Sequence, residues 1–292
     1  MKPRIAITVG DPAGIGPEIA VKAAEHSSVL EVCEPVLYGP SLADELGEFL
    51  RGRVSPEAGA AAYEAIVEAV DDVVAGRVEG IATAPVNKEA FAAAGLPWKG
   101  HTDLLAHLTG ARRAVMMFHS DALRVVLATV HIPLAQVPRA LTREHLEGVV
   151  QLTASEMPRF GYSTPRLAVA GLNPHAGEHG LLGNEEQTVI RPAVDALRRN
   201  GVDVSGPFPA DTLFVRALRG EFDVVVACYH DQGLIPVKMA AFGKAVNVTL
   251  GLPIIRTSVD HGTAFDIAGQ GIADPGSMIE AVRLAARLAR SS

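Results

Sequence analysis

Three histidines are placed where a single metal ion could be bound, because each comes shortly after an apolar run typical of a buried strand. The carboxyl ends of parallel strands meet at one edge of a sheet, so the three imidazoles could share an ion there. Three protein ligands with one position left open are typical of a catalytic metal site. Any one of these histidines taken alone is more often a hydrogen-bonded structural residue, so it is their shared placement that favours the metal. The predicted ligands are His131, His175 and His230.

Two aspartates and a lysine in similar polar stretches are candidates for proton transfer. Asp231 stands beside His230, Asp211 lies in the stretch PADTLF, and Lys88 ends the stretch TAPVNK. The aspartates could also orient metal ligands, since ligating imidazoles commonly donate a hydrogen bond to a carboxylate. The spacing does not rank the three residues as general bases, so all three are predicted catalytic residues.

A second set of polar side chains has the chemistry to hold a phosphate or carboxylate group. Two of its members, Lys238 and Arg256, flank the apolar run Val246–Leu250, although cations of this kind are more commonly solvated at a surface. Charged donors make the stronger hydrogen bonds to an anion, and polar neighbours can complete the site. The predicted substrate-binding residues are His101, Thr102, Lys238, Asn247 and Arg256.

The stretch VGDPAGIGPEIA, residues Val9–Ala20, places glycines at Gly10, Gly14 and Gly16. This spacing matches neither the Rossmann pattern G-x-G-x-x-G nor the Walker pattern G-x-x-x-x-G-K-[ST]. Pro17 is suited to the first turn of a helix, so the stretch predicts a strand, a glycine turn and a helix N-terminus. Backbone N–H groups of such a turn can face a ligand, but the glycines could also serve only the tight turn.

The candidate site residues lie in a sequence where short apolar runs alternate with longer amphipathic segments. This alternation predicts an α/β fold with a largely parallel sheet. The predicted strands are Ile5–Val9, Gly80–Thr83, Ala114–Phe118, Val125–Val130, Leu167–Ala170, Val224–Ala227 and Val246–Leu250. The predicted helices are Ala60–Val74, Arg143–Met157, Glu186–Arg199 and Ser277–Leu288.

The composition excludes several classes of partner. The chain of 292 residues is 48% hydrophobic and carries a formal net charge of −7, so it has no basic surface for nucleic acid or an anionic membrane. Two distant cysteines, Cys33 and Cys228, fit a reducing compartment and predict a cytoplasmic protein. No stretch predicts a signal peptide or a membrane span.

Two of the motifs together resemble the β-decarboxylating dehydrogenases of the isopropylmalate and isocitrate type. They are GDPAGIGPEI near the start and DHGTAFDIAGQGIADPGSM, residues Asp260–Met278, near the end. The resemblance implies an NAD site of non-Rossmann type, with NADP as the alternative. It assigns the cofactor to Gly10, Asp11, Gly14, Asp260, His261, Gly262, Thr263 and Asp266.

A closer resemblance is to the 4-hydroxythreonine-4-phosphate dehydrogenase family of pyridoxal phosphate biosynthesis. It is carried, in order, by TAPVNKEAF, GHTDLLA, NPHAGEHG, PADTLF, YHDQGLIPVK and VNVTLGLPIIRTSVDHGTAFDIAG. It implies NAD-dependent oxidation of 4-phosphohydroxy-L-threonine to a 3-keto acid, which decarboxylates to 3-amino-2-oxopropyl phosphate. Family relatives imply the alternatives of D-threonate or D-erythronate 4-phosphate and of cis-diol carboxylates. The resemblance also implies the histidine ligands and the substrate contacts named above.

The same resemblance implies two α/β/α domains of the isocitrate/isopropylmalate dehydrogenase-like type, with an active-site cleft between them. We expect an NAD-binding domain from residues 1–128 plus 249–292 and a metal- and dimer-forming domain from residues 129–248. The expected assembly is a homodimer with the active site at the subunit interface. The expected metal is Zn²⁺, with Co²⁺, Mg²⁺ or Mn²⁺ as alternatives.

The chain departs from the family pattern between Leu37–Leu50 and Glu57–Gly76, where family members carry a further segment of loop and strand. This shortening concerns the first domain and none of the predicted site residues. Two other functions fit the broad fold: a metal-free phosphate acetyl- or butyryltransferase and a non-catalytic nucleotide-binding regulator. Acyl transfer to phosphate has no use for three strand-end histidines, which favours the dehydrogenase.

Overall fold

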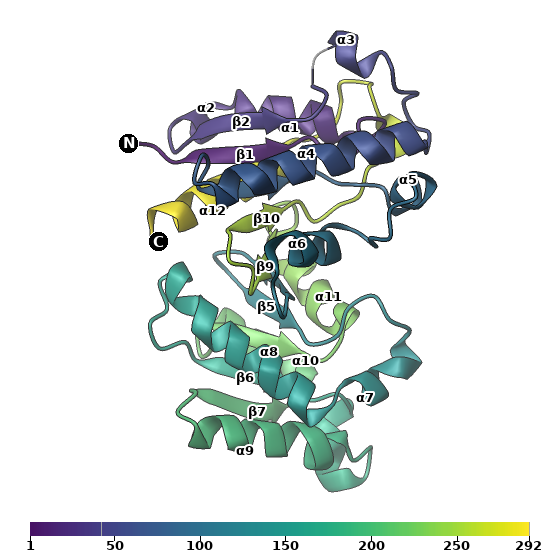
Figure 1. Cartoon of the computed structure of the whole chain (residues 1–292). Helices are drawn as coiled ribbons and strands as arrows, with labels where there is room; N and C mark the ends of the chain where they lie inside the picture. The colour runs from purple at the N-terminus through teal and green to yellow at the C-terminus, as the bar shows by residue number, and fades with distance from the viewer. Residues whose placement is uncertain (42, 292) are drawn as a thin grey trace. The chain divides into compact units, whose positions relative to one another are not determined.

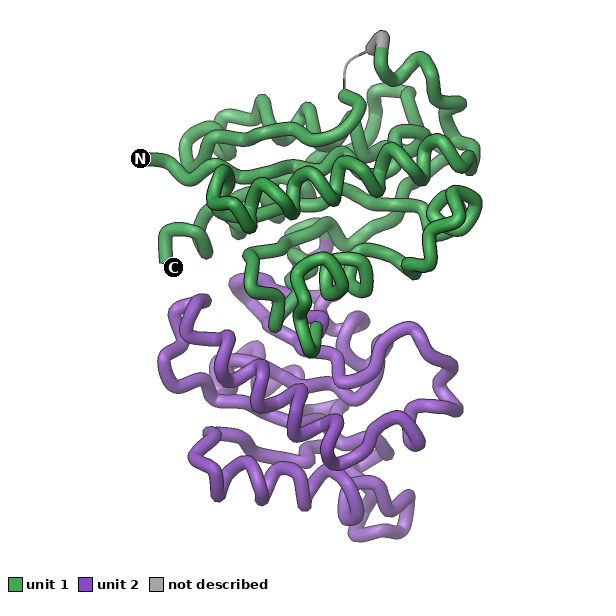
Figure 2. Tube along the Cα trace, viewed as in Figure 1, with its two compact units in different colours: residues 1–114, 243–292 green, residues 115–242 purple. Residues whose placement is uncertain are grey.

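The computed structural model describes residues 1–41 and 43–291 (Figure 1). The chain divides into two compact units, unit 1 from Met1–Ala114 and Gly243–Ser292 and unit 2 from Val115–Phe242 (Figure 2). These divisions differ from the expected domain boundaries after residues 128 and 248, which stay a prediction. The reason is strand pairing, because β5 (Arg124–Leu127) pairs with β8 (Val224–Ala227) of unit 2 and takes the preceding hairpin with it.

Unit 1 contains strands in the order β2-β1-β3-β10-β9. All pairs are parallel except β10 with β9, which are antiparallel. The carboxyl ends of β1, β3 and β10 consequently lie along one edge, where the glycine turn and two other polar stretches emerge. The strands are β1 (Arg4–Thr8), β2 (Glu34–Tyr38), β3 (Gly80–Thr83), β9 (Val246–Leu250) and β10 (Arg256–Ser258).

Helices cover both faces of the unit 1 strands. The helix α4 (Pro56–Val74) runs in front of β1 and α12 (Gly276–Arg290) lies behind it, as Figure 1 shows. Ser55 begins α4, since its side chain accepts a hydrogen bond from the Ala58 N–H. The remaining helices are α1 (Gly16–Ala24), α2 (Ser27–Leu30), α3 (Ala43–Leu46), α5 (Lys88–Ala93), α6 (His101–Thr109) and the short η5 (Phe265–Ile267).

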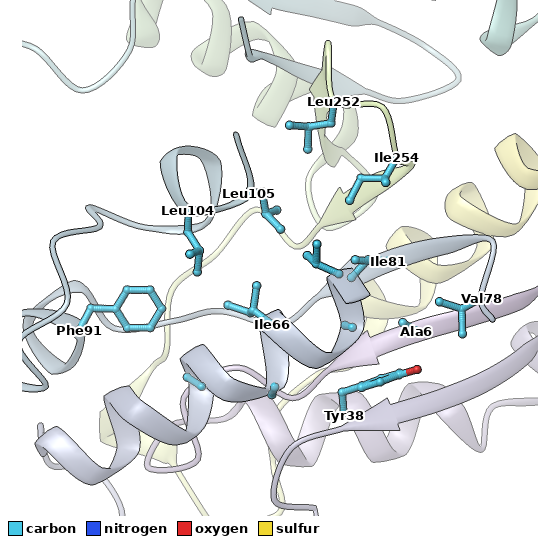
Figure 3. Packing of buried hydrophobic residues seen from close by; sticks show 14 residues of the cluster. Ala6, Tyr38, Ile66, Val78, Ile81, Phe91, Leu104, Leu105, Leu252 and Ile254 are labelled. Carbon is cyan, nitrogen blue, oxygen red and sulfur yellow. The ribbon is translucent and has the colours of Figure 1, made fainter. Parts of the chain in front are cut away.

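One hydrophobic cluster fixes α4, α5 and α6 against the front of these strands (Figure 3). Ile66 of α4 and Phe91 of α5 are almost completely buried, and Leu104 and Leu105 of α6 pack into the same cluster. Ile81 supplies the contact from β3. Because α6 begins at His101, this packing sets the position of a predicted substrate residue.

Unit 2 contains strands in the order β4-β5-β8-β6-β7, with β4 and β5 antiparallel and the others parallel. Helices α8 and α9 pack on one another, while α10 and α11 contact the central strands. The other strands are β4 (Val115–His119), β6 (Leu167–Ala170) and β7 (Val204–Phe208). The helices are η1 (Leu134–Gln136), α7 (Val137–Ala140), α8 (Arg143–Glu156), η2 (Met157–Phe160), η3 (Pro174–Gly180), η4 (Glu186–Ile190), α9 (Arg191–Arg199), α10 (Ala210–Leu218) and α11 (His230–Ala241).

The predicted α/β fold with a largely parallel sheet is confirmed, and each predicted strand and helix has a counterpart. The sequence analysis missed β2, β7 and β10, because β2 and β7 contain Pro35 and Pro207 and β10 has only three residues. It also missed α11, whose first residue is His230. None of the described helices has the length and apolar composition needed to cross a membrane.

Candidate active site

Arg256 is the centre of the polar site in unit 1. It lies at the start of β10 with only 3% of its surface exposed. Its Nη1 donates to Thr249 Oγ1 at 2.9 Å and its Nη2 donates to Thr83 Oγ1 at 2.8 Å, while the buried Nε has no partner within the described chain. Burial lowers the pKa of Arg256 to about 9, which leaves the guanidinium charged at neutral pH. An anion is the partner that this buried charge lacks.

Two other predicted substrate residues also carry a buried polar atom without a partner among residues 1–41 and 43–291. These atoms are Nε2 of His101 and Oδ1 of Asn247. Burial holds the pKa of His101 well below its usual range, and the nearby charge of Arg256 acts in the same direction. His101 is therefore a neutral imidazole at physiological pH and can accept or donate a single hydrogen bond through Nε2.

The last two predicted substrate residues are placed differently. Thr102 follows His101 in the first turn of α6 and is partly buried. Lys238 lies on α11 of unit 2 and is exposed. Unit 1 thus contains four of the five predicted substrate residues.

The glycine turn after β1 is packed tightly against two other segments. Gly10 has φ of +70°, and a Cβ there would meet the Pro85 carbonyl oxygen at 2.2 Å. A Cβ on Gly14 would lie 2.8 Å from the Thr263 carbonyl oxygen, and the Ile15 N–H donates to that oxygen at 2.9 Å. The two loops assigned to the cofactor are therefore in direct contact.

The remaining residues of the second loop lie between β10 and α12. Asp260 Oδ1 accepts a hydrogen bond from the Ser277 hydroxyl at 3.1 Å, and this contact fixes the start of the loop. The Asp266 carbonyl accepts from the Gln270 side chain at 2.8 Å, which closes its end. His261 and Gly262 are exposed between these two points.

Asp11 provides a test of whether the loops suit a nicotinamide nucleotide. The side chain is 1% exposed, Oδ1 accepts from the Ala13 N–H at 2.8 Å, and the buried Oδ2 has no partner within the described residues. Burial raises the pKa of Asp11, and the hydrogen bond from Ala13 opposes this shift. A buried carboxylate oxygen can accept a hydrogen bond from a ligand hydroxyl, and the nearby helix N-terminus suits a phosphate. The residues present therefore fit a dinucleotide.

The segment that is shorter than in the family pattern reaches these loops. The Gly52 N–H donates to the Ala13 carbonyl at 2.8 Å, and Arg51 Nη1 donates to the Gly269 carbonyl at 3.1 Å. A Cβ on Gly269 would collide with the Arg51 side chain. The shortened segment therefore contacts both cofactor loops.

In unit 2, His131 and His230 lie next to each other. Their ring centroids are 5.5 Å apart, and both line a cavity of about 240 Å³. The His230 Nδ1 is 2.7 Å from Asp231 Oδ1, a contact that orients the ring and leaves Nε2 for a ligand. His131 has φ of +52°, which is an uncommon backbone conformation for histidine.

His175 lies in a second cavity of about 830 Å³, which Asp211 also lines. Tyr229 and Asp231 line both cavities, so the two cavities adjoin, with His175 in one and the other two histidines in the other. Within residues 1–41 and 43–291, no three His, Cys, Asp or Glu side chains are grouped closely enough to hold a metal ion. The imidazole and carboxylate types fit a divalent metal, but the shared three-histidine site stays a prediction.

Three polar residues that the sequence analysis did not single out position these histidines. Asn173, two residues before His175, donates its backbone N–H to the buried Glu186 at 2.7 Å. Gln232 Nε2 donates to the Gly171 carbonyl at 2.7 Å, and its Oε1 accepts from the Cys228 N–H at 2.7 Å. Asn173 lies within the NPHAGEHG motif, but Glu186 is indistinguishable in sequence from an exposed first-turn glutamate.

The three candidates for proton transfer are divided between the units. Asp211 and Asp231 are exposed residues of unit 2 beside the histidines. Lys88 is exposed at the start of α5 in unit 1, and a Cβ on Gly100 would lie 3.8 Å from its Cε. Gly100 directly precedes His101, so the Lys88 side chain lies near the start of α6.

The sequence matches a known family over most of its length. Residues 17–285 match the model described as pyridoxal phosphate biosynthetic protein PdxA. A 4-hydroxythreonine-4-phosphate dehydrogenase from Desulforapulum autotrophicum is 44% identical over 323 aligned positions, covering 98% of this chain and 95% of that protein. A D-threonate 4-phosphate dehydrogenase from Pectobacterium atrosepticum is 42% identical, covering 98% and 99%. The aligned length exceeds the 292 residues of this chain, in agreement with a shortened segment.

Solved structures show the same similarity. A 4-hydroxythreonine-4-phosphate dehydrogenase from Klebsiella pneumoniae has a TM-score of 0.89 and 41% identity, covering 99% of this chain and 98% of that one. A terephthalate 1,2-cis-dihydrodiol dehydrogenase from Burkholderia xenovorans has a TM-score of 0.68 and 31% identity, covering 98% of each chain. An isocitrate dehydrogenase from Methylococcus capsulatus shares the fold, with a TM-score of 0.51 and 18% identity, covering 98% and 88%.

Proposed function

Because this chain belongs to the PdxA family of pyridoxal phosphate biosynthetic proteins, we propose that it oxidises 4-phosphohydroxy-L-threonine with NAD. The chain is an oxidoreductase by its family, which removes the acyltransferase and the non-catalytic regulator from consideration. The product is a 3-keto acid, which loses carbon dioxide to give 3-amino-2-oxopropyl phosphate. NADP is the alternative cofactor.

The observation that carries this proposal is the buried charge of Arg256. Its two hydrogen-bond partners in the fold are uncharged hydroxyls, and its Nε is buried without a partner in the described chain. Neutral His101 and the Asn247 amide each add a buried polar atom that lacks a partner there as well. A dianionic phosphate would supply acceptors and charge to such a set, with Thr102 and Lys238 as further contacts.

We assign a divalent metal, in first place Zn²⁺, to His131, His175 and His230. Bound to these imidazoles, such a metal would supply a positive charge that stabilises negative charge developing on the substrate oxygens. Asp231 orients the His230 ring through the 2.7 Å contact with Nδ1. Asp211, Asp231 and Lys88 remain candidates for accepting the hydroxyl proton.

A homodimer is part of the same proposal, and an apolar surface of unit 2 supports it. Large apolar side chains on α10 and α11 are exposed beside the cavity that contains His175. Contiguous exposed apolar surface of this kind commonly marks a protein interface. The side chains are Val215, Leu218, Ile235 and Met239. Cytoplasmic localisation also belongs to the proposal and fits the unpaired thiols of Cys33 and Cys228.

The experiment that tests the proposed function compares substrates. We would load the purified protein with Zn²⁺ and measure NADH formation with 4-phosphohydroxy-L-threonine, D-threonate 4-phosphate and D-erythronate 4-phosphate, each as kcat/KM. Preference for the first supports the proposal, and preference for either sugar acid transfers the same chemistry to a different pathway. Activity with none of the three, or full activity after exhaustive chelation, would contradict it.

A further inference from the structure

We propose that Thr83 is a positioning residue, which fixes the Arg256 guanidinium so that its Nε–H faces the phosphate of the substrate. The inference rests on the proposed function, because it assumes that Arg256 binds an anion. No residue role implied by the family resemblance includes Thr83, which ends a predicted strand and begins the TAPVNK motif without a function of its own. Thr249 supports the same guanidinium from β9.

The hydroxyl of Thr83 is completely buried and makes two hydrogen bonds. Its Oγ1 accepts from Arg256 Nη2 at 2.8 Å and donates to the Thr257 carbonyl at 3.4 Å. The donated bond turns an oxygen lone pair toward the guanidinium, because a hydroxyl has one hydrogen and two acceptor sites. The Thr83 carbonyl in turn accepts from the Ser258 hydroxyl at 3.1 Å, which ties β3 to β10 beside Arg256.

Two hydroxyls determine the plane of the guanidinium. Thr83 and Thr249 are bonded to the two different Nη atoms, so the planar group has one orientation left. Because the orientation is set before the substrate binds, binding does not have to order the Arg256 side chain. A hydroxyl also leaves the positive charge unneutralised, whereas a carboxylate in the same place would compete with phosphate.

The register of the strands places Thr83 within a polar row. Thr8 of β1 and Ser258 of β10 are its neighbours on either side, and Asn247 of β9 pairs with Ser258. The Oγ1 of Thr8 is buried and, within the described residues, has no partner, as is also true of Asn247 Oδ1. The row therefore has spare hydrogen-bonding capacity at the edge where the phosphate is proposed to bind.

The chain offers a matched control for Thr83. Thr257 is also a completely buried strand threonine, but its hydroxyl donates to the Ala281 carbonyl of α12 at 2.8 Å. Thr257 follows Arg256 in β10, and successive side chains of a strand point to opposite faces. Thr257→Val therefore removes a buried hydroxyl of the same unit without touching the guanidinium.

The test uses the full-length, Zn²⁺-loaded protein and the variants Thr83→Val, Thr83→Ser and Thr257→Val. We expect Thr83→Val to raise KM for 4-phosphohydroxy-L-threonine about tenfold with a smaller change in kcat, because one hydrogen bond to a charged group is lost. Calorimetric titration with the same compound, without NAD, is expected to show the same loss of affinity. Thr83→Ser is expected to restore both values, and Thr257→Val to leave both unchanged.

The outcomes separate this inference from the proposed function. If the wild-type protein neither binds nor oxidises any of the three phosphorylated acids, the proposed function fails. If the wild type binds one of them and Thr83→Val binds it equally well, the positioning role is overturned. Equal losses of affinity in Thr83→Val and Thr257→Val would also overturn it, since they would indicate general loosening of the unit. Thermal unfolding of all variants identifies any that do not fold, and Thr83→Ser then decides the case.

Discussion

The polar site of unit 1 and the histidines of unit 2 are built in opposite ways. In unit 1, Arg256 is 3% exposed and held by two hydroxyls, so its geometry is complete in the protein alone. In unit 2, His131 and His175 are exposed, and both have positive φ values. The third predicted ligand, His230, lies near His131 but lines a different cavity from His175.

The difference illustrates two ways in which the side chains of a binding site can be oriented. A guanidinium surrounded by packed strands can be oriented by the fold, and the cost of burying its charge is already met by folding. Imidazoles that lie apart at strand ends, as these do, would be brought together by the ion itself, since metal binding supplies its own free energy. The positive φ values at His131 and His175 agree with a constraint retained for function.

The largest effect is expected from removing a histidine of unit 2. His175→Ala should lower kcat by about 10³-fold or more, because the substrate hydroxyl loses the metal charge that favours its ionisation. The fold should be retained, since the side chain is exposed. His179→Ala, in the same loop with φ of +57°, is the control and should keep most of the activity. Equal losses of kcat in both variants would mean that the conformation of the loop, and not the His175 side chain, determines the activity.

Replacing the charge in unit 1 should separate binding from stability. Arg256→Met should raise KM for the phosphorylated substrate about 100-fold, because a buried charged contact to the phosphate is lost. The affinity for NAD should stay near the wild-type value. The melting temperature should not fall and is expected to rise, since a buried charge without a countercharge is removed. An unchanged KM, or a large loss of NAD affinity, would place the phosphate elsewhere.

The contact between the two cofactor loops can be tested with a pair of glycines. A Cβ on Gly14 would lie 2.8 Å from the Thr263 carbonyl oxygen, so Gly14→Ala should cost about 1–3 kcal/mol of stability and weaken NAD binding. Gly262→Ala is the control for stability alone, because a Cβ there meets nothing within 4 Å although Gly262 belongs to the predicted cofactor set. Urea denaturation and a titration with NAD followed by fluorescence measure both effects. Equal losses of stability in the two variants would exclude the loop contact as a determinant of stability.

The smallest effect concerns the buried imidazole of unit 1. The native pKa of His101 lies well below its unfolded value near 6.5, so below that pH the unfolded chain binds a proton that the native protein does not. Native stability should therefore decrease as pH falls, and between pH 7.5 and 5.5 His101 should contribute about 1 kcal/mol of this loss. The variant His101→Gln should lose that part of the pH dependence. Urea denaturation at the two pH values measures it, and identical slopes in both proteins would contradict the prediction.

The sequence pointed to candidate site residues more readily than to the residues that hold them in place. Strand-end histidines and isolated cations in apolar surroundings are visible as residue types, and the order of motifs identified the family. Thr83 and Thr249 were missed because a threonine in a strand has the pattern of any β-former. Glu186 was missed because its burial depends on a loop that folds back over it from Asn173. The division into compact units follows strand pairing, which composition does not reveal.

The contacts of Arg51 and Gly52 have a consequence for how the protein opens. They join residues near both ends of the chain to its shortened segment, at Ala13 and Gly269. A short connection loses little entropy when it closes, which favours this closed arrangement. We expect the Gly52 amide to exchange its hydrogen only when both cofactor loops detach, and the three segments to unfold locally as one cooperative unit.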